Sequence, residues 1–317
     1  MKGRRRVVNT KHNSMKFSAL HRTAGVRSWL QRMAYGEYEK LLEEEILARS
    51  LPEHVAIIMD GNRRYARKLG ISTEEGYDYG AEITENVINW CFDIGVKQLT
   101  IYAFSSENFY RSDEEKEKLF ELMRVEFEKI SKDERVHRRG VRVRAIGAIN
   151  LLPDSVRAAI NKAERATERY NNFKLFIAVA YSGRIEIVDA IRVIADKVKR
   201  GLLSPGEIDE ETISKHLYIS EVEGEDDAAS DSGAKTSVDL IIRTGGEMRL
   251  SNFVPWQALG NECIAYFCAP FWPEFRRVDL LRAIRTYQER EEEKRQRSES
   301  GRLKLTPLLR RKGLPKE

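Results

Sequence analysis

Residues 238–252 read VDLIIRTGGEMRLSN, and this stretch joins an apolar run to a cluster of polar residues. The apolar half, up to Ile242, predicts a buried strand. The polar half holds two arginines, a glutamate, a serine, an asparagine and two glycines. Glycines let the backbone approach an anion closely, and arginine forks match phosphate oxygens. The stretch therefore predicts either a diphosphate site at a strand end or a polar turn that caps the next helix.

A second stretch has the same order. Residues 54–59 are an apolar run that predicts a strand and stops at Asp60-Gly61-Asn62-Arg63-Arg64. A short helix is expected over residues 65–69, closed by Gly70. Its N-terminus offers free N–H groups and a positive dipole end to an anion. Asp60 would repel a phosphate, so its position predicts a divalent cation such as Mg²⁺ between the two, or else an N-cap role.

Two further apolar runs end in polar residues. Residues 98–104 are followed by Ser105-Ser106-Glu107-Asn108 and by Arg111, and residues 173–180 are followed by Tyr181-Ser182-Gly183-Arg184. Open α/β sheets bind their ligands outside the carboxyl ends of the strands. The four strand ends together predict an α/β fold with a central, mostly parallel sheet flanked by helices, and a cleft along one edge of that sheet.

Four blocks of the sequence resemble the signature blocks of the cis-prenyltransferases, the family of undecaprenyl and dehydrodolichyl diphosphate synthases. They are residues 54–64, 102–108, 242–253 and 272–275. The blocks occur in the family's order and spacing, and the resemblance covers residues 51–290. Residues 255–273 are more similar to the archaeal branch than to the bacterial one.

The resemblance implies a homodimeric, Mg²⁺-dependent enzyme. Such an enzyme adds isopentenyl diphosphate repeatedly to an allylic diphosphate, farnesyl or geranylgeranyl, and each addition makes a new cis double bond. The product would be a long-chain polyprenyl diphosphate, the precursor of a glycan-carrier lipid. The growing chain would occupy a hydrophobic tunnel between helices and sheet. The candidate walls are residues 83–94 and residues 116–130, where apolar side chains recur at helical spacing: Leu119, Phe120, Met123, Phe127 and Ile130.

The resemblance also implies roles for individual residues. Asp60 matches a metal-binding aspartate, and Glu262 matches a second metal carboxylate that could come from the partner subunit; a surface glutamate beside a turn is the alternative for Glu262. Asp60, Asn62 and Ser105 are the expected catalytic residues. The expected substrate-binding residues are Gly61, Asn62, Arg63, Arg64, Tyr65, Ser105, Glu107, Asn108, Arg111, Arg243, Arg249 and Ser251, of which the last three match the isopentenyl diphosphate site.

Three positions depart from the family pattern. Thr73 and Tyr77 stand where many relatives carry an arginine and a histidine, and Met248 stands where a histidine is common. These losses put the affinity for the allylic diphosphate in question. Because Asp60 and the arginine pair remain, an active enzyme is expected, and a non-catalytic or regulatory subunit of a heteromeric cis-prenyltransferase is the alternative.

Composition agrees with a cytoplasmic enzyme. The three cysteines, Cys91, Cys263 and Cys268, fit no disulfide or zinc framework and favour a reducing compartment. No apolar run is long enough to span a bilayer, and no signal peptide is expected. A net charge of +5 permits nucleic-acid binding. However, the arginines concentrate at strand ends beside acidic residues and no recognition motif occurs, so no nucleic-acid partner is expected.

The expected domain organisation has three parts. Residues 1–50 form a basic, amphipathic arm that could lie on an anionic membrane or pack on its own domain. Residues 51–290 form the catalytic domain, with a flexible acidic insertion at 221–237, and residues 291–317 form a charged tail. The insertion contains DDAASD, which is similar to the aspartate-rich motif of trans-prenyltransferases. It lies in a Gly/Ser/acid stretch without apolar periodicity and is interpreted as a solvated loop.

Overall fold

The computed structural model describes residues 36–221, 237–258 and 263–311. Glu262, most of the acidic insertion and most of the N-terminal arm lie outside the described residues. The described part of the chain contains a six-stranded sheet with the order β3-β4-β2-β1-β5-β6 and only parallel pairs. This confirms the expected α/β class. The strands are β1 (His54–Ile58), β2 (Gln98–Tyr102), β3 (Val141–Ile146), β4 (Phe173–Ala178), β5 (Leu240–Arg243) and β6 (Ile264–Phe267).

The sequence predicted only the four inner strands, and the two edge strands β3 and β6 were missed. β3 reads VRVRAI and alternates buried valines with half-buried arginines. β6 has only four residues, IAYF, and none of them is fully buried. Edge strands pack on fewer neighbours than inner strands do, so they carry a weaker hydrophobic signal.

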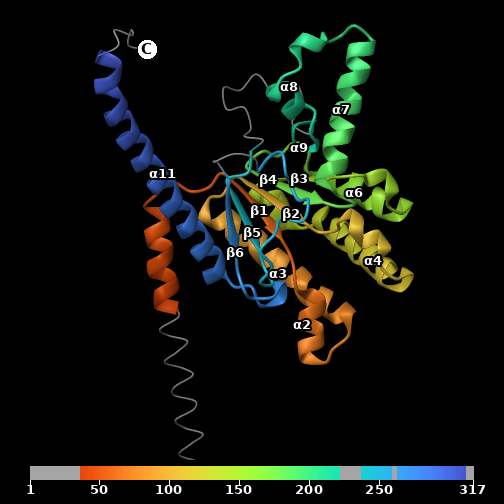
Figure 1. The fold of residues 1–317 in the computed structure, drawn as a ribbon. Coiled ribbons are helices and arrows are strands. Elements are labelled where there is room, and N and C mark those ends of the chain that lie inside the picture. The colour runs from red at the N-terminus through yellow and green to blue at the C-terminus, as the bar shows by residue number, and fades with distance from the viewer. Residues whose placement is uncertain (1–35, 222–236, 259–262, 312–317) are drawn as a thin grey trace, which may run out of the picture.

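Helices connect the strands and cover the sheet (Figure 1). The α-helices are α2 (Asn62–Leu69), α3 (Thr73–Ile94), α4 (Asp113–Ile130), α5 (Glu134–Arg139), α6 (Asp154–Thr167), α7 (Gly183–Lys199), α8 (Glu210–Lys215), α9 (Tyr218–Glu221) and α11 (Arg277–Arg311). The 3-10 turns are η1 (Ser106–Tyr110), η2 (Ile149–Leu151), η3 (Pro205–Glu207) and η4 (Trp272–Glu274). α2 ends at Gly70 as expected but begins at Asn62, earlier than the predicted residue 65.

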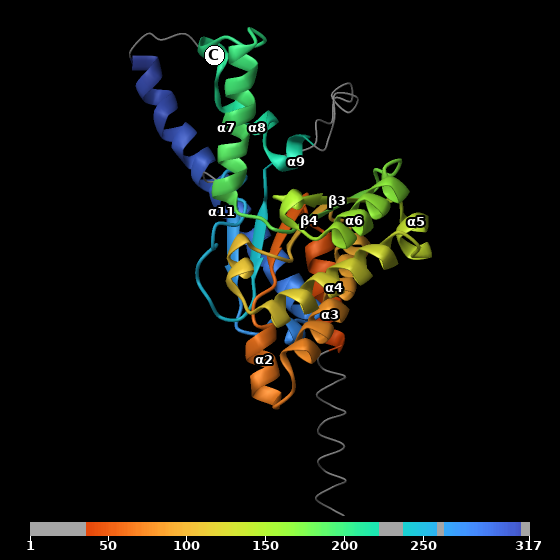
Figure 2. The same cartoon turned by 90° about the vertical axis from the view of Figure 1, so that its right-hand side faces the viewer.

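Both faces of the sheet are buried, which is typical of parallel sheets. Side chains alternate along each strand. Val55 and Ile57 of β1 belong to the larger hydrophobic core, whereas Ala56 and Ile58 belong to a second cluster on the opposite face. The larger core packs against α3, α4 and α6, which lie together on one side of the sheet in both views (Figures 1 and 2).

The end of the predicted N-terminal arm packs on the domain. Residues 36–47 are helical and lie beside α11 (Figure 1), with Leu42 and Ile46 buried. Arg277 of α11 forms an ion pair with Glu39 at 3.1 Å, and Gln288 donates a hydrogen bond to the Ile46 carbonyl at 2.8 Å. α11 itself continues past residue 290. Within the described ranges, no helix has both the length and the apolar character needed to cross a membrane.

Candidate active site

Asp60 follows β1 at the carboxyl edge of the sheet, and hydrogen bonds to its backbone N–H and carbonyl hold it there. The Thr244 hydroxyl donates to the Asp60 carbonyl at 2.7 Å and accepts from the Asp60 N–H at 3.0 Å. The Trp272 N–H donates to the same carbonyl at 3.0 Å. β1 and β5 pair in parallel with Ile58 opposite Arg243, so the residues that follow the two strands become neighbours. The sheet register therefore brings together two sites that are 183 residues apart.

The Asp60 carboxylate lies between two guanidinium groups. Arg243 Nη2 donates to Oδ2 at 2.8 Å, and Arg64 Nη2 lies 3.0 Å from Oδ1. Arg243 is only 5% exposed, and its Nη1 also donates to Ser251 Oγ at 2.7 Å and to the Arg249 carbonyl. The buried arginine thus orders the loop after β5. Arg64 is tied to that loop as well, because Nη1 donates to the Gly245 carbonyl at 2.8 Å.

Asn62 contributes a buried acceptor to the same place. Its Oδ1 is buried and has no hydrogen-bond partner within the described part of the chain. An unsatisfied buried polar atom costs about 1–3 kcal/mol, and such an atom calls for an explanation such as an absent ion or ligand. The side chain fits closely against α3, since a Cβ on Gly80 would lie 2.6 Å from Oδ1. Gly80 therefore provides the space that Asn62 occupies.

A Gly80→Ala substitution tests this packing. Alanine favours the helix by about 0.5–1 kcal/mol, and the atom it meets is the end of a side chain that can rotate away. We expect an unchanged or higher melting temperature, but a turnover ~10–100-fold lower, because small displacements of positioned groups are costly in catalysis. Steady-state kinetics and thermal melting measure the two effects. Gly206→Ala is the control, because its nearest atom would be 3.9 Å away; normal turnover in Gly80→Ala would contradict the assignment.

The second predicted cluster follows β2. Ser105 precedes η1, where its N–H donates to Asn108 Oδ1 at 2.9 Å. Arg111 ends this turn, and its Nη1 donates to Glu115 Oε1 at 2.8 Å. Burial raises the pKa of the Tyr77 hydroxyl, which lies beside Arg111, well above its usual range. The phenol is therefore neutral at physiological pH.

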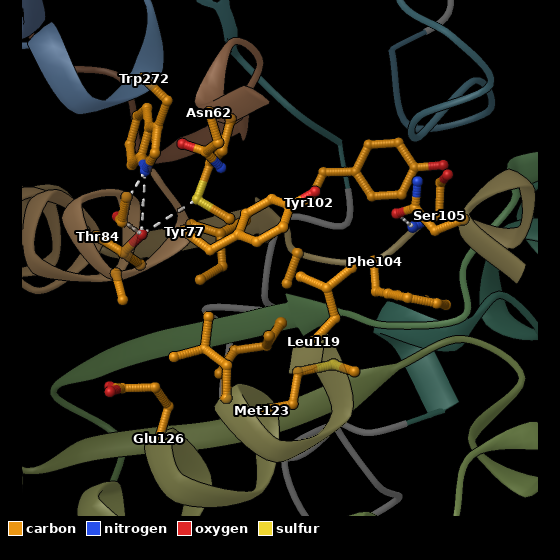
Figure 3. Close-up of a pocket in the computed structure, with 18 of the residues that line it drawn as sticks. Asn62, Tyr77, Thr84, Tyr102, Phe104, Ser105, Leu119, Met123, Glu126 and Trp272 are labelled. Carbon is orange, nitrogen blue, oxygen red and sulfur yellow. Dashed lines mark hydrogen bonds between the residues drawn. The ribbon is translucent and has the colours of Figure 1, made fainter. Parts of the chain in front are cut away.

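A cavity of about 370 Å³ runs from these polar groups between the sheet and helices α3 and α4. It confirms the predicted tunnel between helices and sheet. The polar end is lined by Asp60, Asn62, Tyr77, Ser105, Glu107, Asn108, Arg111, Arg243 and Ser251. The apolar part is lined by Met59, Ala81, Ile88, Phe104, Leu119, Met123, Phe127, Ile130 and Trp272, among others. Figure 3 shows several of these side chains around the cavity.

Of the five apolar residues predicted for the α4 wall, four line the cavity. The prediction was wrong for Phe120, which instead packs on Phe104 with ring centroids 5.5 Å apart. Glu126, on the same helix, lines the cavity and was not predicted. Burial raises the pKa of its carboxyl group, and Asp78 adds to the effect.

Five predicted residues lie around the cavity without lining it. Gly61 has a φ of 120° and packs against Phe271, where an added Cβ would meet the Phe271 Cβ at 2.8 Å. Arg63, Arg64 and Tyr65 belong to α2, and the Arg249 side chain is 66% exposed and pairs with Glu247 at 2.7 Å.

Several residues that contribute to the site were not identified from the sequence. Thr244 fixes the backbone of Asp60, and Trp272 donates from its indole to the Gly80 carbonyl at 2.8 Å. Thr84 donates to the same carbonyl at 2.8 Å and, like Tyr77, lines the cavity. Thr244 and Trp272 lie within two of the recognised blocks, which is the signal that could have identified them.

Comparison with known proteins agrees with this geometry. Residues 58–295 match the model of a family described as putative undecaprenyl diphosphate synthase. The chain belongs to the cis-prenyltransferase family. It is 51% identical over 261 residues to the tritrans,polycis-undecaprenyl-diphosphate synthase (geranylgeranyl-diphosphate specific) of Methanosarcina mazei, covering 82% of this chain and 84% of that protein. The protein of the same name from Archaeoglobus fulgidus is 49% identical over 253 residues, covering 80% and 95%.

Two solved structures are similar to this cis-prenyltransferase. Lavandulyl diphosphate synthase from Lavandula x intermedia, in complex with dimethylallyl diphosphate, has a TM-score of 0.66 and 35% identity over 75% of this chain and 95% of that one. A probable undecaprenyl diphosphate synthase from Campylobacter jejuni has a TM-score of 0.57 and 27% identity with the same coverage. The expected archaeal-like branch and the expected prenyl transferase activity class are confirmed, and neither alternative class gains support.

Proposed function

We propose that this chain elongates geranylgeranyl diphosphate with successive isopentenyl diphosphate units and releases a long polycis-polyprenyl diphosphate. The observation that carries the proposal is one cavity whose lining is polar at the carboxyl edge of the sheet and mostly apolar beyond it, with Glu126 as a charged exception. A diphosphate and a growing hydrocarbon chain need these two environments joined end to end. The names of the archaeal relatives favour geranylgeranyl diphosphate as the starter over farnesyl diphosphate.

Two anionic groups would bind at the polar end. Arg243, Arg249 and Ser251 would hold isopentenyl diphosphate, because the Arg243 guanidinium is fixed by Ser251 and Asp60 in a buried setting. The N-terminus of α2 faces the same region with Gly61, Asn62, Arg63 and Arg64, and would receive the allylic diphosphate. Ser105, Glu107, Asn108 and Arg111 line the same cavity.

The residues present fit a Mg²⁺ ion that is completed by substrate. Within the described ranges, no group of three or more His, Cys, Asp or Glu side chains could hold a metal on its own. Mg²⁺ commonly uses one or two carboxylates, water and substrate phosphates, and Asp60 offers a carboxylate that is 28% exposed. Asn62, whose side-chain oxygen has no hydrogen-bond partner in the described ranges, lines the same cavity. A Mg²⁺ bound by Asp60 would neutralise charge on the departing diphosphate.

The chain's own residues would supply the rest of the chemistry. In each addition the allylic carbon–oxygen bond breaks, a carbon–carbon bond to the isopentenyl alkene forms, and one proton leaves to a diphosphate oxygen. Arg64, Arg111 and Arg243 would stabilise the leaving diphosphate by fixed positive charge. Asn62 and Ser105 would orient the reacting ends. The apolar wall would exclude water from the electron-deficient allylic group and would receive the lengthened tail.

Metal removal tests this proposal directly. The purified chain is incubated with radiolabelled isopentenyl diphosphate, Mg²⁺ and either geranylgeranyl or farnesyl diphosphate, and the extracted lipids are sized. We expect a long polyprenyl product, made preferentially from geranylgeranyl diphosphate, whose formation stops with EDTA and resumes when Mg²⁺ is restored. No product from a folded chain with either starter would contradict the proposal and would favour the regulatory-subunit alternative.

The homodimer and the membrane contact stay predictions. Analytical ultracentrifugation of the purified chain tests the first, and flotation with anionic vesicles tests the second. A dimer would bear on catalysis if Glu262, the predicted second metal ligand, comes from the partner subunit.

A further inference from the structure

Three side chains form a hydrogen-bonded triangle at the polar end of the cavity, and Arg63 Nε lies 4.0 Å from Glu115 Oε1 beside it. The Tyr77 hydroxyl of α3 donates to Glu115 Oε1 of α4 at 2.5 Å and accepts from Arg111 Nη1 at 2.5 Å. Arg111 Nη1 also donates to Glu115 Oε1 at 2.8 Å. Tyr77 is 9% exposed, and the Arg111 and Glu115 side chains are each 19% exposed. The triangle is therefore largely withdrawn from water, where charge-assisted bonds are strong.

Tyr77 and Glu115 act on Arg111 in different ways. The phenol is neutral, since burial and the bond to Glu115 raise its pKa, so it can orient the guanidinium without cancelling its charge. Glu115 carries a negative charge and therefore competes with any anion for the same guanidinium. Both bonds use Nη1, and the Arg111 side chain donates no other hydrogen bond among the described residues. Nε and Nη2 thus remain available to a ligand on the cavity side, which Arg111 lines.

We propose that Tyr77 is a positioning residue for Arg111 and that Glu115 is an internal competitor for it. On binding, the diphosphate of the allylic substrate would displace Glu115, while Tyr77 would keep the guanidinium facing the cavity. The inference rests on the proposed function and assigns a role to the tyrosine that stands where relatives carry a histidine. Such a competitor would favour release of pyrophosphate. Each addition leaves pyrophosphate in the allylic site, and it must depart before the diphosphate of the lengthened chain can bind there.

Affinity for inorganic pyrophosphate tests the inference without catalysis. Isothermal titration of the full chain in Mg²⁺ should show binding that is about tenfold weaker in Tyr77→Phe and ~3–10-fold tighter in Glu115→Gln. Glutamine keeps an acceptor for the phenol but removes the competing charge. The opposite signs are the diagnostic result, because damage to packing would weaken binding in both variants. Partial unfolding cannot increase the affinity for pyrophosphate. The measurement on Glu115→Gln therefore tests the inference even if Tyr77→Phe is unstable.

Matched control variants are available on η1 and α4. Tyr110 is 91% exposed and Glu114 is exposed on the first turn of α4, so Tyr110→Phe and Glu114→Gln should leave the affinity unchanged. In kinetics, Tyr77→Phe should raise the KM for the allylic diphosphate about tenfold with little change in kcat or in the KM for isopentenyl diphosphate. A uniform loss in all three constants would indicate a merely structural role.

The outcomes separate the inference from the proposed function. If the unmodified chain binds no pyrophosphate and makes no polyprenyl product, the proposed function is wrong. If it binds pyrophosphate but the two variants change the affinity in the same direction, or not at all, the function stands and the inference about Tyr77 and Glu115 is overturned.

Discussion

The Asp60→Asn variant should lose prenyl transfer by about 10³-fold or more while remaining folded. Asparagine has the shape of aspartate, so the backbone bonds to Thr244 and Trp272 persist. What disappears is the negative charge that pairs with Arg64 and Arg243 and that would hold Mg²⁺ against a diphosphate. Arg243 would then lose its carboxylate partner, and of the described carboxylates Arg64 would keep only Glu247 at 3.8 Å.

The stability cost should be modest. Asp60 is 28% exposed, so its ion pairs are partly solvated, and an asparagine oxygen still accepts a hydrogen bond from Arg243. We expect the free energy of unfolding to fall by about 1–2 kcal/mol, between the values for surface and buried pairs. Chemical denaturation and initial-rate assays separate the two effects. Asp113→Asn is the control, since that side chain is 91% exposed on α4; full turnover in Asp60→Asn would remove Asp60 from the active site.

Larger side chains on α3 that fill the cavity should shorten the product, and the product should be shorter when the substituted residue lies nearer the polar end. Ala81 and Ile88 both line the apolar part, and they are separated by seven residues of helix, about 10 Å along the wall. We expect Ala81→Trp, nearer the polar end, to stop elongation after the first few additions. Ile88→Trp should stop it later, at products still shorter than those of the unmodified chain. Sizing the lipids by mass spectrometry reports both lengths.

One control variant serves both substitutions, and one outcome would contradict the prediction. Ile191 lies on α7, is 54% exposed and does not line the cavity, so Ile191→Trp should leave the product length unchanged. Because Ala81 faces empty space, a larger side chain there avoids much of the usual cost of overpacking. Equal product lengths in all three variants would mean that the growing chain leaves the protein by another route.

The departures from the family pattern have different structural meanings. Met248 is 80% exposed on the loop after β5, and nothing in the structure connects it to the cavity. Thr73 opens α3, whose start is already satisfied by the Ser72–Glu75 capping box. Tyr77 alone among the three lines the cavity and contacts a cavity-lining cation. Of the two histidine positions that are lost, we therefore expect the one occupied by Tyr77 to affect the cavity.

The sequence alone was sufficient to predict the inner strands, the end of α2 and the polar residues at the strand ends. Continuous apolar runs predicted the four inner strands, because strands buried on both faces need apolar residues at every position. Gly70 correctly predicted the end of α2, where its backbone adopts a left-handed conformation. The polar residues after each inner strand predicted where ligands bind, since parallel strands end at one edge. The recognised blocks added the family, which periodicity could not reveal.

Only the tertiary structure decided which groups meet. The contact between Asp60 and Arg243 depends on the register of β1 against β5, and the Tyr77–Arg111–Glu115 triangle depends on how α3 packs beside α4. The same packing leaves the Asn62 side-chain oxygen without a hydrogen-bond partner among the described residues. Local sequence carries no information on such pairings, because the interacting residues are distant along the chain and their contacts form only when the sheet and helices assemble. The same reason applies to β3 and β6, whose short or alternating sequences become strands through the neighbours they pair with.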